Sequence, residues 1–231
     1  MGLEAGPPLV LSNALGTTAE LWDPQLPVLG ERFHVVLYDH LPRSSVADLG
    51  RDVLAMADDL GLGRFSLCGL SLGGMVGMWL AVNAPDRIGR LVLACTSARF
   101  GVPEEWGARA ALVRAQGMPA VAYDALQKWF TPAYGGRERF LEMQLGIPRE
   151  DYAQGLEAIG GFDFRERLGE IAAPTLVIAG AQDSATTPED ADFIAREIPS
   201  ASLVVLEGAG HLANVEQSEA FTSAVLEHLR G

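Results

Sequence analysis

The sequence predicts an α/β fold in which helices cover both faces of a mostly parallel, doubly wound sheet. Short apolar runs bounded by turn residues alternate with stretches of helical period along most of the 231 residues, the pattern of a parallel sheet buried on both faces. Strands connected through helices in this way imply right-handed crossovers. The candidate strands are 9–12, 34–38, 65–68, 90–94, 175–179 and 202–206, and the candidate helices are 46–60, 72–83, 188–197 and 218–229.

One interval, residues 99–168, breaks this alternation. It contains no convincing strand, but it holds amphipathic pieces separated by Gly and Pro, at about 104–116, 120–130, 138–145 and 150–159. We interpret it as a helical cap inserted into a core made of residues 1–98 and 169–231. Such an insertion would lie over the crevice where open α/β sheets bind ligands. The alternative is extra scaffold with no role in the site.

The composition argues against several classes of partner. Seventeen basic and 30 acidic residues give a net charge of -13, and no basic cluster could follow a phosphate backbone or an anionic membrane surface. No apolar run approaches the roughly 20 residues that cross a bilayer, and the N-terminus does not resemble a signal peptide. We therefore expect a cytoplasmic protein that binds neither nucleic acid nor membranes. Cys68 and Cys95 lie in apolar segments without the spacing of a zinc site, which predicts reduced core thiols and no metal.

A nucleophile motif lies at residues 69–73, which read GLSLG. The motif follows a predicted strand and runs into a predicted helix, the context in which Gly-x-Ser-x-Gly forms a strained turn that presents a serine. Ser71 would lie at the amino end of that helix, where unpaired N–H groups favour developing negative charge. We predict Ser71 as the nucleophile and the Leu72 N–H as an oxyanion donor.

The motif resembles the nucleophile elbow of α/β-hydrolases, in which the acid follows the nucleophile along the chain and the histidine comes last. Among the four histidines, His211 follows strand 202–206 through a flexible loop at the carboxyl edge of the sheet, where Ser71 is also expected. Asp183 follows strand 175–179 in the same way. We predict His211 as the general base and Asp183 as the acid that orients the imidazole. Glu207 is the nearest rival of Asp183, and a turn-forming role is the alternative for Asp183.

A second oxyanion donor is expected from the loop after the first strand. Residues 12–18 of that loop read SNALGTT, and we predict the Leu15 N–H as the donor. The alternative is a glycine-rich turn with no catalytic part.

Longer stretches around these residues resemble the 3-oxoadipate enol-lactonases. The stretches are LSNALGTT (11–18), WDPQL (22–26), CGLSLGGMVG (68–77), LACTSARF (93–100), KWFTP (128–132) and HLANVEQ (211–217). The resemblance covers most of the core. It implies an α/β-hydrolase that opens a five-membered enol-lactone bearing a carboxylate to 3-oxoadipate, in bacterial aromatic catabolism. The reaction would pass through an acyl-enzyme at Ser71 and need no cofactor.

An anionic lactone needs a cation or several N–H donors in the site. Arg99 and Trp129 are the predicted substrate contacts. The sequence alone does not separate Arg99 from Arg109 and Arg114, and Trp129 could equally anchor a cap helix to the core.

The chain departs from the resembled family in three places. The first core strand begins almost at residues 7–9, so the family's N-terminal hairpin is missing, the loop after residues 38–40 is short, and the cap is shortened between 134 and 147. These departures suggest a trimmed or engineered enzyme, whose level of activity does not follow from the sequence. An exposed edge strand could also promote self-association. The alternative functions are a broad-specificity carboxylesterase or lactonase with the same triad, or a non-catalytic or engineered scaffold on the same fold.

Overall fold

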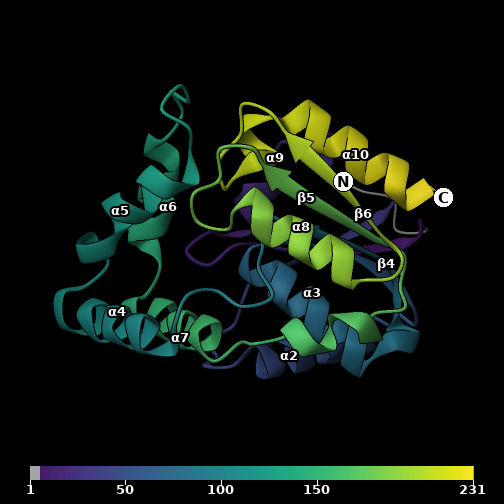
Figure 1. The fold of residues 1–231 in the computed structure, drawn as a ribbon, viewed down its shortest axis with the longest axis horizontal. Helices are drawn as coiled ribbons and strands as arrows, with labels where there is room; N and C mark the ends of the chain where they lie inside the picture. The colour runs from purple at the N-terminus through teal and green to yellow at the C-terminus, as the bar shows by residue number, and fades with distance from the viewer. Residues whose placement is uncertain (1–5, 231) are drawn as a thin grey trace.

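The computed structural model describes residues 6–230, and its central feature is a six-stranded parallel sheet (Figure 1). The strand order is β2-β1-β3-β4-β5-β6, and each neighbouring pair is parallel. The predicted α/β fold is confirmed, and all six predicted strands form close to their predicted positions. The strands are β1 (Pro8–Ser12), β2 (His34–Tyr38), β3 (Phe65–Leu70), β4 (Ile88–Ala94), β5 (Thr175–Gly180) and β6 (Ala201–Leu206).

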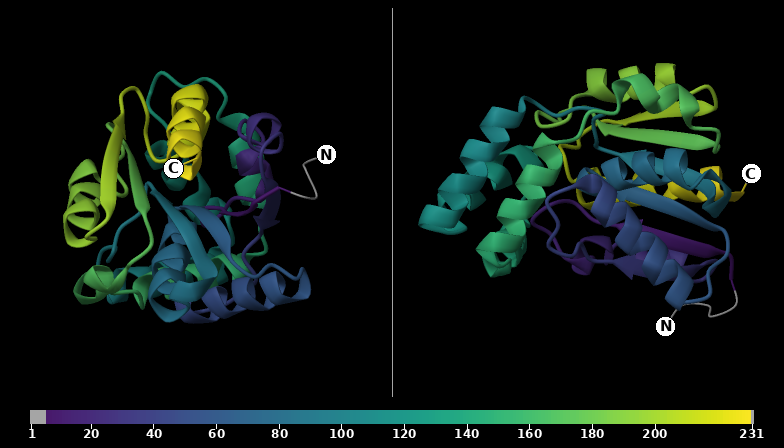
Figure 2. Two further views of the ribbon diagram at one scale, coloured as in Figure 1. Left: turned by 90° about the vertical axis from the view of Figure 1, so that its right-hand side faces the viewer. Right: turned by 90° about the horizontal axis from the view of Figure 1, so that it is seen from below.

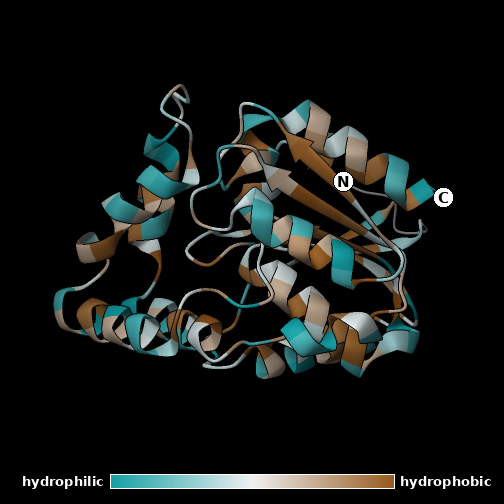
Figure 3. Ribbon diagram, in the orientation of Figure 1, coloured by the Kyte–Doolittle hydropathy of each residue, from teal (hydrophilic) through white to brown (hydrophobic). Residues whose placement is uncertain are grey.

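Helices cover both faces of this sheet (Figure 2). One face carries α2 (Val46–Asp59), α3 (Leu72–Asn83) and α8 (Pro188–Glu197), and the other carries α1 (Leu26–Leu29) and α10 (Ser218–Arg230). Side chains alternate across the sheet because successive residues of a strand point to opposite faces. In β3, Phe65 and Leu67 therefore join the first core cluster, and Cys68 and Leu70 join the second. Figure 3 shows the resulting division, with hydrophobic strands inside and hydrophilic residues on the outer helices.

Four further helices lie between β4 and β5 along the chain. They gather beyond the carboxyl ends of the strands (Figure 1), where the cap was expected. Two of them, α4 and α7, pack on each other through a small cluster that includes Ala110, Val113 and Leu156. The division of the chain at 98/99 and 168/169 stays a prediction. The helices are α4 (Pro103–Gln116), α5 (Pro119–Trp129), α6 (Glu138–Gly146) and α7 (Arg149–Gly160).

Several short elements were not predicted, because a single helical turn carries too few residues to show a period. They are η1 (Ala19–Trp22), η2 (Pro85–Arg87), η3 (Arg165–Glu170) and α9 (Ala213–Glu216), together with α1.

Within residues 6–230, β1 is the first strand, so no hairpin precedes it in this part of the chain. β2 pairs only with β1 and forms one edge of the described sheet; self-association through it stays a prediction. Across the same residues, no helix combines the length and the apolar character needed to cross a bilayer. Cys68 and Cys95 are buried free thiols, and burial raises the pKa of both.

Candidate active site

Ser71 lies on a sharp turn between β3 and α3. Its backbone has φ 56° and ψ -113°, a conformation that L-residues adopt only when the surroundings hold it. Two hydrogen bonds hold it here: the Ser71 N–H donates to the Ala94 carbonyl at 2.9 Å, and the Thr96 hydroxyl donates to the Ser71 carbonyl at 2.7 Å. Both partners come from β4 and the residues just after it, so the neighbouring strand fixes the turn.

Two glycines allow the close packing around this turn. A Cβ atom on Gly69 would lie 2.1 Å from the Gly73 carbonyl oxygen, and one on Gly73 would lie 2.1 Å from the Ser12 carbonyl oxygen. Any side chain at either position would displace α3 from β3 or from the loop after β1.

The structure brings Ser71, His211 and Asp183 together at the carboxyl edge of the sheet. The Nε2 atom of His211 lies 2.9 Å from Ser71 Oγ, and its Nδ1 atom lies 2.8 Å from Asp183 Oδ2. The three residues are only 6%, 3% and 4% exposed, in the order Ser71, His211, Asp183. A neutral imidazole in this place donates its Nδ1–H to the carboxylate and accepts the serine proton at Nε2.

Asp183 is held by donors that were not predicted from the sequence. Its Oδ1 atom accepts from the Ala185 N–H at 2.8 Å and the Thr186 N–H at 3.0 Å, and its Oδ2 atom accepts from the Thr186 hydroxyl at 2.9 Å. Charge-assisted hydrogen bonds of this kind orient a carboxylate. The sequence carries a local pattern that predicts these bonds, because an Asp with a Thr three residues later is typical of turns closed by side-chain hydrogen bonds.

The loop of His211 is tied to the end of α5. The Gly210 N–H donates to Glu216 Oε2 at 2.6 Å, while Glu216 Oε1 accepts from both the N–H and the hydroxyl of Thr131, at 3.0 and 2.7 Å. The Leu212 N–H donates to the Trp129 carbonyl at 2.9 Å. The histidine is therefore linked on both sides to the segment at the end of α5, directly through Leu212 and indirectly from Gly210 through Glu216 of α9.

The loop after β1 is closed by its own side chains. The Asn13 amide donates to the Thr17 carbonyl at 2.6 Å, and the Thr17 hydroxyl donates to the Ala14 carbonyl at 2.8 Å. Within residues 6–230, neither the Leu15 N–H nor the Leu72 N–H donates to an acceptor. Both N–H groups are thus without an acceptor in this part of the chain, and Leu15 lines the same cavity as Ser71.

Ser71 and His211 line a cavity of about 80 Å³ whose other walls come largely from α4, α5 and α7. Trp129 lies in this lining and also belongs to the second core cluster, so the structure places it at both positions that the sequence left as alternatives. The lining is mainly apolar, and its charged members are Arg109 and Lys128. Among the described residues, no carboxylate lines it. That charge balance is unusual for a chain of net charge -13.

The three candidate arginines, which the sequence could not rank as substrate contacts, differ in their partners in the structure. Arg99 pairs with Asp163 across a β-bridge, with Nε 3.9 Å from Oδ2, and is not part of the lining. Arg114 forms ion pairs with Glu150 and Glu157. Arg109 makes one long hydrogen bond, 3.4 Å to the Val121 carbonyl, and forms no salt bridge with the described part of the chain.

Tyr152 of α7 lies next to Arg109 in the same lining. Burial raises the pKa of its phenol, and Arg109 opposes the rise. The hydroxyl is therefore protonated at neutral pH and can donate a hydrogen bond.

Comparison with known proteins decides the family. Residues 9–224 match the alpha/beta hydrolase family. The chain belongs to this family. The 3-oxoadipate enol-lactonase 2 of Acinetobacter baylyi is 38% identical to this α/β-hydrolase over 233 residues, which cover 95% of this chain and 87% of that protein. The crystal structure of the enol-lactonase from Burkholderia xenovorans has a TM-score of 0.95 and 37% identity, and covers 100% of this chain and 94% of that one.

A further relative, from Caulobacter sp., carries the name carbamate hydrolase RutD. It is 34% identical to this α/β-hydrolase over 248 residues, which cover 96% of this chain and 90% of that protein. The family and the enol-lactonase relatives confirm the prediction of a carboxylic-ester hydrolase.

Proposed function

We propose that this enzyme opens an enol-lactone that carries a carboxylate, 3-oxoadipate enol-lactone to 3-oxoadipate, with Ser71 as nucleophile, His211 as base and Asp183 as the orienting acid. The observation that carries the proposal is that the Ser71–His211 pair, 2.9 Å apart, faces a small cavity whose charged lining residues are both cations. The pair supplies ester chemistry, and the cations select an anionic substrate. The name of the Acinetobacter relative supports the same substrate, and that of the Burkholderia relative supports an enol-lactone.

Ring opening follows from the positions of these groups. Ser71 Oγ attacks the lactone carbonyl carbon while its proton passes to His211 Nε2. The Leu15 and Leu72 N–H groups stabilise the oxyanion, each by about 3 kcal/mol in the transition state. Collapse breaks the ring C–O bond, and the departing enol oxygen takes the proton from His211. The enol then becomes the ketone, and the other end of the opened chain stays on Ser71 as an acyl ester.

The second half returns the enzyme to its starting state. Water enters, gives a proton to His211 Nε2 and attacks the acyl carbon. The C–O bond to Ser71 breaks, and the serine oxygen takes the proton back from His211. Asp183 stays ionised throughout and stabilises the imidazolium that forms twice.

Arg109 is the best-placed partner for the substrate carboxylate. Its guanidinium can grip a carboxylate with two parallel hydrogen bonds, and no ion pair with the described residues competes for it. Lys128, on α5, adds a second positive charge in the same lining. Arg99 and Arg114 are already paired with acids. We therefore assign the carboxylate contact to Arg109 in place of Arg99, with Trp129 as an apolar wall.

A comparison of two substrates tests this proposal. We expect wild type to hydrolyse the enol-lactone far better than phenyl acetate, and Ser71→Ala to lose at least about 10⁴-fold of both activities. A serine-directed fluorophosphonate should label wild type and leave Ser71→Ala unlabelled. A large preference for phenyl acetate would point to a broad esterase, and equal labelling of the two proteins would exclude Ser71 as the nucleophile.

Replacing the arginine tests the substrate contact. We expect Arg109→Met to raise KM for the enol-lactone about tenfold or more, the effect of losing a charged hydrogen-bond partner, while turnover of neutral phenyl acetate stays the same. Arg149→Met is the matched control, because Arg149 is an exposed arginine of α7 outside the cavity lining. The assignment fails if both variants behave alike.

A further inference from the structure

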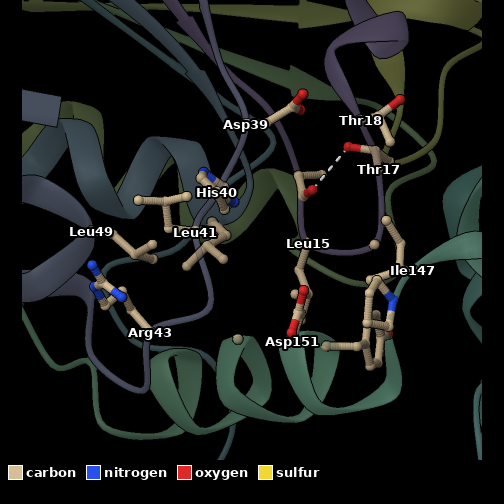
Figure 4. Close-up of a pocket in the computed structure, with 16 residues that line it drawn as sticks. Leu15, Thr17, Thr18, Asp39, His40, Leu41, Arg43, Leu49, Ile147 and Asp151 are labelled. Carbon is tan, nitrogen blue, oxygen red and sulfur yellow. Dashed lines mark hydrogen bonds between the residues drawn. The ribbon is translucent and has the colours of Figure 1, made fainter. Parts of the chain in front are cut away.

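A second cavity, of about 240 Å³, adjoins the first. Its walls come from the loop after β1, the segment between β2 and α2, and the beginning of α7. In Figure 4, Leu41, Leu49 and Arg43 face Leu15 and Asp151 across this space. Two side chains, Leu15 and Tyr152, line both cavities.

These two side chains form a closely packed partition. A Cβ atom on Gly155 would lie 2.3 Å from Leu15 Cδ1, so the leucine rests directly on the backbone of α7. A Cβ atom on Gly16 would lie 2.9 Å from Tyr152 Cε2, so the tyrosine ring rests on the loop after β1. The loop after β1 and helix α7 thus each contribute one large side chain and one glycine, and each large side chain packs on the glycine of the other element.

The two spaces differ in character as well as in size. The cavity beside Ser71 has about a third of the volume of its neighbour. The larger cavity has apolar lining from Leu41, Leu49, Leu72 and Ile147, and charged lining from Asp39, Arg43 and Asp151. Its apolar surface suits an alkyl chain, whose transfer from water is favourable in proportion to the area buried.

We propose that Leu15 and Tyr152 determine substrate size by closing the nucleophile's cavity against the larger one. In wild type the partition restricts the site to compact esters and lactones. When the side chain of Leu15 or Tyr152 is truncated, an alkyl chain reaches the second cavity while its ester group stays at Ser71. This inference rests on the proposed function, because it concerns the same nucleophile.

The test compares kcat/KM for p-nitrophenyl acetate and p-nitrophenyl octanoate. Wild type should strongly prefer the acetate. Leu15→Ala keeps the backbone N–H of residue 15 and removes the isobutyl group, so the octanoate-to-acetate ratio should rise about tenfold or more, the scale of discrimination by a few methylenes in an apolar pocket. Tyr152→Leu is the second variant and should shift the ratio in the same direction.

Leu41→Ala is the matched control. Leu41 is 49% exposed and lines only the larger cavity, so its truncation enlarges that cavity without opening the partition and should leave the ratio unchanged. The inference is overturned if wild type already accepts octanoate as well as acetate, if neither partition variant that folds changes the ratio, or if Leu41→Ala changes it equally. If the proposed function is wrong, the result is different, because Ser71→Ala would then still hydrolyse p-nitrophenyl acetate.

Discussion

Thr186 donates its hydroxyl to Asp183 at 2.9 Å, on the same Oδ2 atom that lies 2.8 Å from His211 Nδ1. The hydroxyl oxygen is also 3.2 Å from that Nδ1 atom. Thr186 therefore holds both carboxylate oxygens, Oδ2 through its hydroxyl and Oδ1 through its N–H, and it limits the rotation that would take Oδ2 away from the imidazole.

Thr186→Val should lower kcat about tenfold, the effect of losing one hydrogen bond worth roughly 1.4 kcal/mol, with little change in KM. Thr186→Ser should restore most of the activity, because it returns the hydroxyl. Steady-state kinetics on p-nitrophenyl acetate measure both effects. Thr175→Val is the control, since Thr175 is a buried threonine whose hydroxyl, among the described residues, donates only to the Ala173 carbonyl. If it lowers kcat as much as Thr186→Val does, Thr186 has no special role in positioning Asp183.

Asp183→Asn should reduce kcat by about 10⁴, because the amide favours the wrong imidazole tautomer and cannot stabilise the imidazolium. The thermal midpoint should change little, because an asparagine oxygen can still accept from the backbone donors. Glu207→Gln tests the rival acid, because Glu207 is an exposed residue at the same edge of the sheet. A larger loss in Glu207→Gln than in Asp183→Asn would transfer the acid's role to Glu207.

Gly69→Ala should destabilise the fold by about 3 kcal/mol, the upper range for overpacking, because its Cβ would lie 2.1 Å from a backbone oxygen that cannot rotate away. Urea unfolding measures the change. Gly63→Ala is the control, since a Cβ at Gly63 meets nothing within 4 Å. Similar midpoints for the two variants would show that the elbow can relax.

His40 should make the fold less stable in mild acid. Burial lowers its pKa from 6.5 to about 4, so between these values the unfolded chain binds a proton that the folded chain refuses. The free energy of unfolding therefore falls as pH decreases from 6.5 to 4 and is unaffected by this group above 6.5. The contribution is at most about 3 kcal/mol, and the partial exposure of His40 to the larger cavity reduces it.

His40→Gln should flatten this dependence. The measurement is the urea midpoint of both proteins at pH 7 and pH 4.5, and the difference between the two drops isolates the histidine from the carboxylates that also titrate. Parallel drops in the two proteins would contradict the expectation.

The triad positions could be predicted from sequence because each depends on local signals. Ser71, Asp183 and His211 each follow a strand of strong apolar pattern, and parallel strands bring their carboxyl ends to one edge. Arg99 also follows a strand, but it does not line the cavity beside Ser71. It lies beside Asp163, a residue 64 positions away along the chain, with which it forms a β-bridge and a 3.9 Å ion pair.

The choice of Arg109 among the three candidate arginines, the place of Tyr152 and the partition could not be predicted from sequence for a related reason. Which side of α4 or α7 faces the sheet depends on how the two helices pack against each other, through residues such as Val113 and Leu156. The period of either helix does not contain that information. The contact of Leu15 with Gly155 likewise joins a core loop to an inserted helix, and only the folded chain shows it.

The bonds from Glu216 and from the Trp129 carbonyl to the His211 loop make the base and one wall of the cavity a single mechanical unit. Lys128 and Trp129 belong to that wall, so a displacement of α5 toward or away from a substrate carries the imidazole with it. We therefore expect the position of the imidazole to depend on how the substrate is bound. Damage at the end of α5 should then weaken affinity and turnover together, at a distance from the serine itself.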